Sequence, residues 1–109
     1  MKRQGHKETQ MVFARRVSFD IAPGKDVEFK TLLNNEILPL LKKQDGFRDE
    51  MVLVNENHGM GISLWKTREN INTYNTTVYP EVAKKLTPYL KAQPTVEVYE
   101  VTHGTINLN

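Results

Sequence analysis

One stretch, residues 59–67, constrains the fold of this chain more than any other. It reads Gly-Met-Gly-Ile-Ser-Leu-Trp-Lys-Thr and contains the only tryptophan in the 109 residues. Ile62 and Leu64 alternate with Ser63 and Trp65, which is the two-residue period of a β-strand. A helical pattern begins directly after it. The remaining elements can therefore be placed by how they would pack around this strand.

Three further segments follow the strand period, at 11–21, 47–55 and 95–105. In the first of them Arg15 interrupts an apolar face, between Phe13 and Val17. An unpaired guanidinium is costly to bury, so Arg15 must reach solvent, an acidic group or a polar cavity. The alternative is that Arg15 lies on the solvent side of a strand whose twist differs from the simple alternation.

Two segments have helical spacing, 27–43 and 68–89. Pro39 falls inside the first pattern and removes one backbone hydrogen bond, so we expect a kink near Glu36 rather than two separate helices. Pro80 falls inside the second and predicts a break just before it.

The order strand, helix, strand, strand, helix, strand predicts an α+β, ferredoxin-like βαββαβ fold, with a four-stranded antiparallel sheet and both helices on one face. Apolar side chains occur on both faces of the strands, and we assign Val52 and Val54 to the face away from the helices. That face needs a cover. A second copy of the chain is the simplest one, so we expect a homodimer with two sheets packed face to face, a dimeric α/β barrel.

Composition excludes several classes of function. The formal charge of +2 comes from interspersed residues of both signs, which argues against nucleic acid and membrane partners. The absence of cysteine excludes a thiol nucleophile and fits a cytoplasmic protein. The three histidines lack metal-ligand spacing, so we expect no metal site. We interpret residues 1–10 as a flexible N-terminal arm and 11–109 as a single domain.

Four motifs occur in order along the chain: Ala22-Pro23-Gly24-Lys25 after the first strand, then the segments 37–47, 63–69 and 96–101. With them, residues 11–103 resemble the antibiotic biosynthesis monooxygenase domain of the dimeric α/β-barrel superfamily. The resemblance implies the fold above. It leaves function open, because that family includes cofactor-independent oxygenases of quinols and aromatic polyketides, haem-degrading enzymes and members of unknown role.

The haem-degrading branch of that family is disfavoured here. It carries an asparagine, a tryptophan and an axial histidine at the positions that correspond to Arg15, Tyr74 and Lys84. All three differ in this sequence. A lysine in place of the histidine leaves the iron without its imidazole ligand.

The resemblance therefore favours a cofactor-independent monooxygenase, with no cofactor, acting on a quinol-like or polycyclic phenolic substrate. Arg15 would attract an anionic oxygen, Trp65 would stack on or wall the ring, and Tyr74 would donate a hydrogen bond; these three are the expected catalytic residues. Tyr79 and Asn75 would bind the substrate. Each aromatic residue can instead be an ordinary core residue, and Asn75 can belong to a solvated helix face.

Two hypotheses thus remain open. The first is the monooxygenase, and the second is a non-catalytic dimeric module that binds a small hydrophobic or aromatic ligand or only assembles. A cavity between sheet and helices, lined by Trp65, Arg15 and Tyr74, would favour the first or a ligand binder. A solid core there would favour a structural role.

Overall fold

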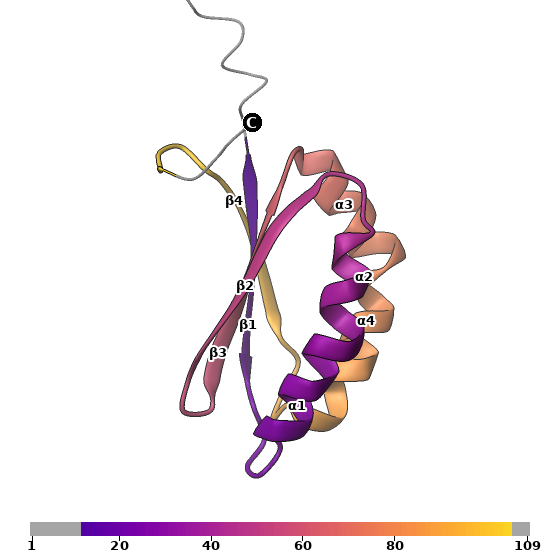
Figure 1. The fold of residues 1–109 in the computed structure, drawn as a ribbon, viewed down its shortest axis with the longest axis vertical. Helices are drawn as coiled ribbons and strands as arrows, with labels where there is room; N and C mark the ends of the chain where they lie inside the picture. The colour runs from indigo at the N-terminus through magenta and orange to yellow at the C-terminus, as the bar shows by residue number, and fades with distance from the viewer. Residues whose placement is uncertain (1–11, 106–109) are drawn as a thin grey trace, which may run out of the picture.

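A computed structural model of the chain describes residues 12–105, and the expected arm at 1–10 lies outside them. Figure 1 shows the elements, which follow in the order β1 (Phe13–Asp20), α1 (Asp26–Leu32), η2 (Leu33–Ile37), α2 (Leu38–Lys42), β2 (Phe47–Asn55), β3 (His58–Trp65), α3 (Arg68–Thr77), α4 (Tyr79–Leu86), η3 (Thr87–Tyr89) and β4 (Thr95–Glu100). The predicted alternation of strands and helices is confirmed.

The four strands form one antiparallel sheet in the order β2-β3-β1-β4. The pairing of β1 with β3 forms the middle of the sheet, and β2 and β4 lie at the edges. All helices cover the same face of this sheet (Figure 1). The predicted α+β, ferredoxin-like fold is therefore confirmed, and one sheet face is left without a layer of its own in the described part of the chain.

The first helix continues through α1, η2 and α2 with one irregular turn. The Leu38 amide donates to the carbonyl of Leu33, a spacing of five residues that defines η2 as a π-helical turn. Pro39, which has no amide hydrogen, follows at the start of α2. The irregularity lies over residues 33–37, where the kink near Glu36 was expected.

The second helix begins and breaks where its sequence indicates. The Thr67 hydroxyl accepts a 3.0 Å hydrogen bond from the Asn70 amide and caps α3. Val78, with φ of −120°, leaves the helical region between α3 and α4. Pro80 lies in the first turn of α4, where its missing amide hydrogen costs no helical bond. The predicted break before Pro80 is confirmed.

A β-bulge near the start of β2 decides which side chains of that strand face the helices. Phe47 pairs with Trp65, but the next pairing joins Asp49 to Leu64. Arg48 is therefore an extra residue that has no counterpart in β3. Side chains alternate along a strand, so the extra residue makes every later side chain of β2 point to the opposite face from the one that simple alternation from Phe47 would give.

As a result Glu50 and Val52 point toward the helices, opposite Ser63 and Gly61 of β3, while Met51 and Leu53 point away. The assignment of Val52 and Val54 to the face away from the helices was wrong. The prediction that the side chains of this segment alternate between two faces is confirmed, but the bulge decides which residues lie on which face. The apolar groups of β2 on the uncovered face are Met51 and Leu53.

The core lies between the sheet and the helices. Trp65, Ile21 and Ile71 are fully buried, and Phe29 is 1% exposed. The cluster of buried side chains comprises Ile21, Phe29, Ile37, Leu41, Trp65, Ile71, Tyr74, Val82, Leu86 and Leu90. This layer holds the helices on the sheet and surrounds the polar site described next.

Candidate functional site

Arg15 is a buried charge in the middle of the core. It lies on β1, is 3% exposed, and points toward the helices together with Val17. Its Nε donates a 2.7 Å hydrogen bond to Oδ1 of Asn75 on α3. Within residues 12–105 no carboxylate lies within ion-pair distance of it. The alternative that Arg15 lies on the solvent side of its strand is therefore excluded.

Two tyrosines of the second helix flank the guanidinium group. Its central carbon lies 4.2 Å from the centroid of the Tyr79 ring and 4.9 Å from that of Tyr74. These are cation–π distances. Burial lowers the pKa of Arg15, and the neighbouring tyrosines act in the opposite direction. An arginine begins so far above neutrality that Arg15 keeps its charge at physiological pH.

The polar groups of this cluster are not all satisfied. Nη2 of Arg15 and the Tyr79 hydroxyl are buried and make no well-formed hydrogen bond, although the two side chains lie close enough to interact with each other. Both residues line a small, partly open cavity of about 50 Å³ between the sheet and the helices, and Tyr74 lines it too. Unpaired donors facing a cavity are the feature expected of a site that binds an oxygen-bearing group, because leaving such donors buried and unpaired is costly.

Glu50 also lines this cavity, and the sequence analysis missed it. Burial raises the pKa of Glu50 to about 7, although the positive charge of Arg15 acts to lower it. The residue type and its position in an alternating segment gave no indication of a site. Only the bulge at Arg48, which turns Glu50 toward the helices, reveals its place.

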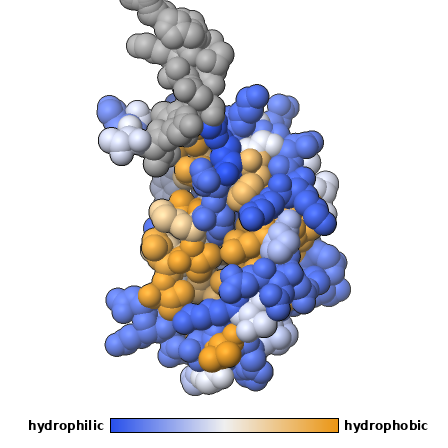
Figure 2. All heavy atoms as spheres, in the orientation of Figure 1, coloured by the Kyte–Doolittle hydropathy of each residue, from blue (hydrophilic) through white to orange (hydrophobic). Residues whose placement is uncertain are grey.

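A groove of about 270 Å³ lies on the outer side of the cavity, between β2 and the irregular turn η2. Figure 2 shows apolar side chains gathered in a band across the middle of the molecule, between the sheet and the helices. The groove is lined by Lys30, Leu33, Asn34, Leu38, Glu50, Met51, Val52 and Val54. Leu33, Glu50 and Val52 line both spaces and so form the wall between groove and cavity.

Trp65 supports the site from behind and does not line the cavity. Its indole N–H donates a 2.8 Å hydrogen bond to the Ser63 hydroxyl. Its ring lies 5.3 Å from the Tyr74 ring and 5.6 Å, edge-on, from Phe47. Trp65 was expected to stack on or wall the substrate ring, and in the structure it lies outside the lining of this cavity. Tyr74 stands between Trp65 and Arg15.

With the geometry described, known structures can be compared. No family model matches the sequence, and no curated protein matches it either. A monooxygenase from Streptomyces coelicolor, crystallised with nanaomycin D, superposes with a TM-score of 0.72 at 13% identity, covering 94% of this chain and 98% of that one. Others named antibiotic biosynthesis monooxygenases, some of them provisionally, superpose similarly. This chain has the antibiotic biosynthesis monooxygenase fold.

The same fold also occurs in proteins without an assigned role. A protein of unknown function from Nitrosomonas europaea has a TM-score of 0.74 at 16% identity, over 90% of this chain and 96% of that one. A conserved protein from Methanosarcina mazei superposes with a TM-score of 0.70 at 18% identity, covering 86% of this chain and 96% of that one. At these identities the likeness is one of fold, so the antibiotic biosynthesis monooxygenase fold does not by itself assign a reaction to this chain.

Other features of this antibiotic biosynthesis monooxygenase fold are less suited to chemistry. A wider hollow of about 550 Å³ lies near the β2–β3 turn, where His58 and Asp20 pair with each other and are exposed. Lys84, at the position of the haem ligand in the resemblance, is exposed on α4. In the described residues, no group of three His, Asp or Glu side chains could hold a metal ion. No helix among them is long and apolar enough to span a membrane.

Proposed function

We propose that this protein is a cofactor-independent monooxygenase of the cytoplasm that acts on a quinol-like or polycyclic phenolic substrate. The observation that carries the proposal is the buried Arg15, which lines the cavity with Tyr79 and whose Nη2, like the Tyr79 hydroxyl, makes no well-formed hydrogen bond. The Streptomyces coelicolor monooxygenase of the same fold, which was crystallised with nanaomycin D, agrees with this choice of substrate class.

The reaction of such an enzyme needs no electron source other than its substrate. A hydroquinone loses a proton, and the resulting phenolate gives one electron to dioxygen. The superoxide and the substrate radical then form a carbon–oxygen bond. The peroxide loses water, so that hydroquinone and dioxygen become hydroxyquinone and water. The protein has to favour the phenolate and stabilise the negative charge that develops on oxygen.

The side chains around the cavity fit these tasks. Arg15 is the cation that stabilises the phenolate and the superoxide, and Tyr79 donates a hydrogen bond from its free hydroxyl. Tyr74 presents its ring to the site, backed by Trp65. Asn75 binds Arg15 rather than facing the cavity, so we assign it the task of holding the guanidinium in position.

Size decides how a substrate would lie. The small cavity of about 50 Å³ admits an oxygen group but not an aromatic ring, since sites for small ligands hold roughly 300–1,000 Å³. The groove of about 270 Å³ is close to that range. We therefore place the ring in the groove, with one hydroxyl passing the wall of Leu33, Glu50 and Val52 toward Arg15. Binding requires these three side chains to move apart.

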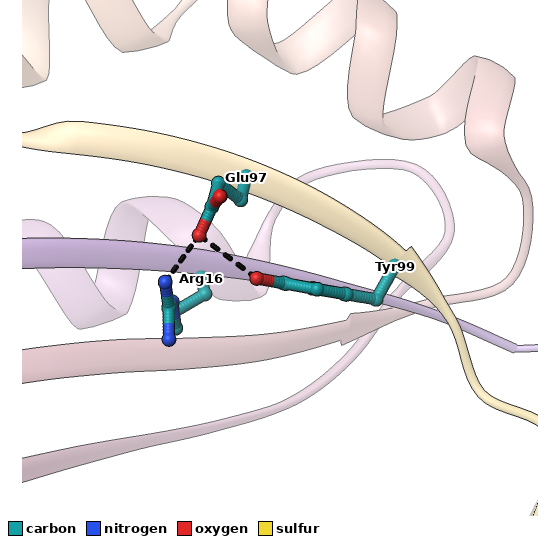
Figure 3. Close-up of polar contacts among 3 residues, drawn as sticks. All are labelled: Arg16, Glu97 and Tyr99. Atoms are coloured by element: carbon teal, nitrogen blue, oxygen red, sulfur yellow. Dashed lines mark hydrogen bonds and ion pairs between the residues drawn. The ribbon is translucent and has the colours of Figure 1, made fainter.

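A homodimer is part of the proposal. On the uncovered sheet face Met51 is 54% exposed, Leu53 46% and Tyr99 45%. Two charged residues of that face are paired with each other, because Glu97 accepts hydrogen bonds from both Arg16 and the Tyr99 hydroxyl (Figure 3). A paired charge can be covered without leaving an isolated ion. Nε of Arg16 is buried without an acceptor, which a second copy could supply.

The small cavity also favours a second candidate, a non-catalytic dimeric module that binds a small aromatic or hydrophobic ligand in the groove. Both candidates use the same groove. They differ in whether bound substrate reacts with dioxygen.

Oxygen uptake measures that difference. Wild type is assayed with hydroxylated naphthoquinols and anthrones, without flavin, metal or nicotinamide. We expect uptake that is lost in Arg15→Leu and retained in Arg68→Leu, a matched change at an exposed arginine at the start of α3. Equal uptake in both variants would remove Arg15 from the mechanism. Quenching of Trp65 fluorescence by the same compounds without any uptake would favour the binding module.

A further inference from the structure

Glu50 is placed where a proton could pass between the buried site and solvent. It lines the small cavity together with Arg15, Tyr74 and Tyr79, and it lines the outer groove together with Lys30. A carboxylate in this wall has one side toward the substrate oxygen and the other toward the open groove. No other residue of the cavity wall has a carboxylate or an imidazole, among the described residues.

Two features of the strands create this position. The bulge at Arg48 turns Glu50 inward, opposite Ser63, and Gly61, which lies diagonal to Glu50 on β3, leaves the space that its carboxylate fills. A Cβ built on Gly61 would lie 2.9 Å from Oε2 of Glu50. A side chain at residue 61 would therefore push the carboxylate out of its position.

The charged and titratable groups that face Glu50 come from four elements: Arg15 on β1, Tyr74 on α3, Tyr79 on α4 and Lys30 on α1. Burial raises the pKa of Tyr74 to about 12 and also raises that of Tyr79, so neither tyrosine is a base at neutral pH. Burial raises the pKa of Glu50 to about 7. A group that titrates near the working pH is the most effective general base.

We propose that Glu50 is the general base of this site, which takes the proton from a neutral phenolic substrate bound against Arg15; this inference rests on the proposed function. The substrate O–H bond breaks, and its electron pair stays on the substrate oxygen as a phenolate beside Arg15. The proton forms an O–H bond with the Glu50 carboxylate, and water in the groove then takes it. Charge is conserved within the site at this step, because one anion replaces another.

The same geometry indicates the substrate class. A phenol that arrives neutral meets the ionised Glu50 as a hydrogen-bond acceptor. A substrate that arrives as an anion meets the same carboxylate as a like charge in the wall that it must pass. We therefore expect neutral, weakly acidic phenols to be preferred over phenols already ionised in solution.

A naphthol tests the proton transfer without the oxygenation. Its phenolate absorbs at longer wavelength than the phenol, and infrared difference spectra report a protonated carboxyl group. At about pH 8, above the pKa of Glu50, we expect naphthol bound to wild type to show the phenolate absorption together with a new carboxylic acid band. The band should be absent from Glu50→Gln and present in Asp49→Asn, which changes the neighbouring exposed carboxylate.

Three outcomes overturn the inference: a bound phenolate with Glu50 still ionised, a bound naphthol that stays neutral in wild type, or the carboxylic acid band persisting in Glu50→Gln. Turnover gives a second measurement, in which Glu50→Gln should lower kcat by about 10²–10⁴-fold and remove the rise of rate with pH near neutrality. Asp49→Asn should keep both the wild-type kcat and the rise of rate with pH.

These results separate the inference from the proposed function. If wild type protonates Glu50 on binding naphthol but no phenol causes oxygen uptake, the role of Glu50 as proton acceptor stands and the oxygenase proposal fails. If uptake depends on Arg15 while Glu50 stays ionised, the oxygenase proposal stands and the inference about Glu50 fails.

Discussion

Nε of Arg15 donates a 2.7 Å hydrogen bond to Oδ1 of Asn75, and this bond ties the central strand β1 to the helix α3 across the core. It holds the guanidinium beside the rings of Tyr74 and Tyr79 and leaves Nη2 buried without a well-formed hydrogen bond. The proposed binding of a ligand oxygen depends on this free donor group.

Removing the acceptor should destabilise the protein. In Asn75→Ala the buried Nε of Arg15 loses its partner, so we expect the free energy of unfolding to fall by about 1–3 kcal/mol. Urea denaturation followed by Trp65 fluorescence measures this change. The control is Asn72→Ala, an exposed position on the same helix, with an expected change within about 0.5 kcal/mol. Equal effects of the two variants would show that the hydrogen bond contributes nothing specific.

Two glycines of β3 should respond differently to the same substitution. A Cβ at Gly59 would lie 2.5 Å from the Phe19 ring and 2.9 Å from the carbonyl oxygen of Leu53, which cannot easily move. We expect Gly59→Ala to cost about 1–3 kcal/mol of stability, as overpacking usually does. The Cβ of Gly61→Ala meets only the flexible end of Glu50, so stability should change little while the rate of oxygen uptake falls.

Urea denaturation and oxygen uptake on both glycine variants measure these effects. A stable, fully active Gly61→Ala protein would contradict the assigned position of the Glu50 carboxylate. A Gly59→Ala protein as stable as wild type would contradict the close packing of Phe19 on β3.

Stability should depend on pH through Glu50. Burial raises its pKa from 4.5 to about 7, so between these values the folded protein binds one proton more than the unfolded chain. The free energy of unfolding must therefore fall as pH rises from about 4.5 to 7, by at most about 3 kcal/mol from this group. Denaturation curves across this range should show the fall in wild type and not in Glu50→Gln. Parallel pH profiles of the two proteins would contradict the burial of Glu50.

The proposed dimer depends on the uncovered sheet face. Leu53→Lys introduces a charge into its apolar part, so we expect sedimentation velocity at micromolar concentration to show a monomer. Val27 is 70% exposed on α1, outside the sheet, and Val27→Lys is the matched control that should stay dimeric. A wild-type protein that is itself monomeric at this concentration would refute the dimer.

The arrangement of strands and helices could be predicted because it depends on periodicity and on residues with fixed backbone effects. Pro39 and Pro80 mark the irregular turn and the break in the two helices, since a missing amide hydrogen acts locally whatever the tertiary context. Arg15 could be singled out because a charge in an apolar row requires an explanation. The structure brings Arg15, Tyr74 and Tyr79 together around one cavity, while their catalytic roles stay predictions.

The sequence does not reveal which residues of β2 face the helices. Val52 and Val54 were assigned to the wrong face, and Glu50 was overlooked, for the same reason. A bulge needs no glycine or proline, so the residues around Arg48 give no local signal of it. Trp65 was expected beside the substrate because of the family resemblance, but the ring of Tyr74, whose place depends on the packing of α3, lies against it.

The single extra residue at Arg48 has an evolutionary consequence. If that residue were lost and the rest of β2 kept its partners in β3, the strand would become regular and Glu50 would still face the helices. If Arg48 stayed and instead paired with Leu64, Glu50 would pair with Ile62 and leave the interior, and Met51 would enter it. Proteins with this backbone could thus gain or lose an internal acid through the form of one strand pairing, without any change in the order of their strands. Sequence alignments of such chains would then conceal which residues of this strand face inward.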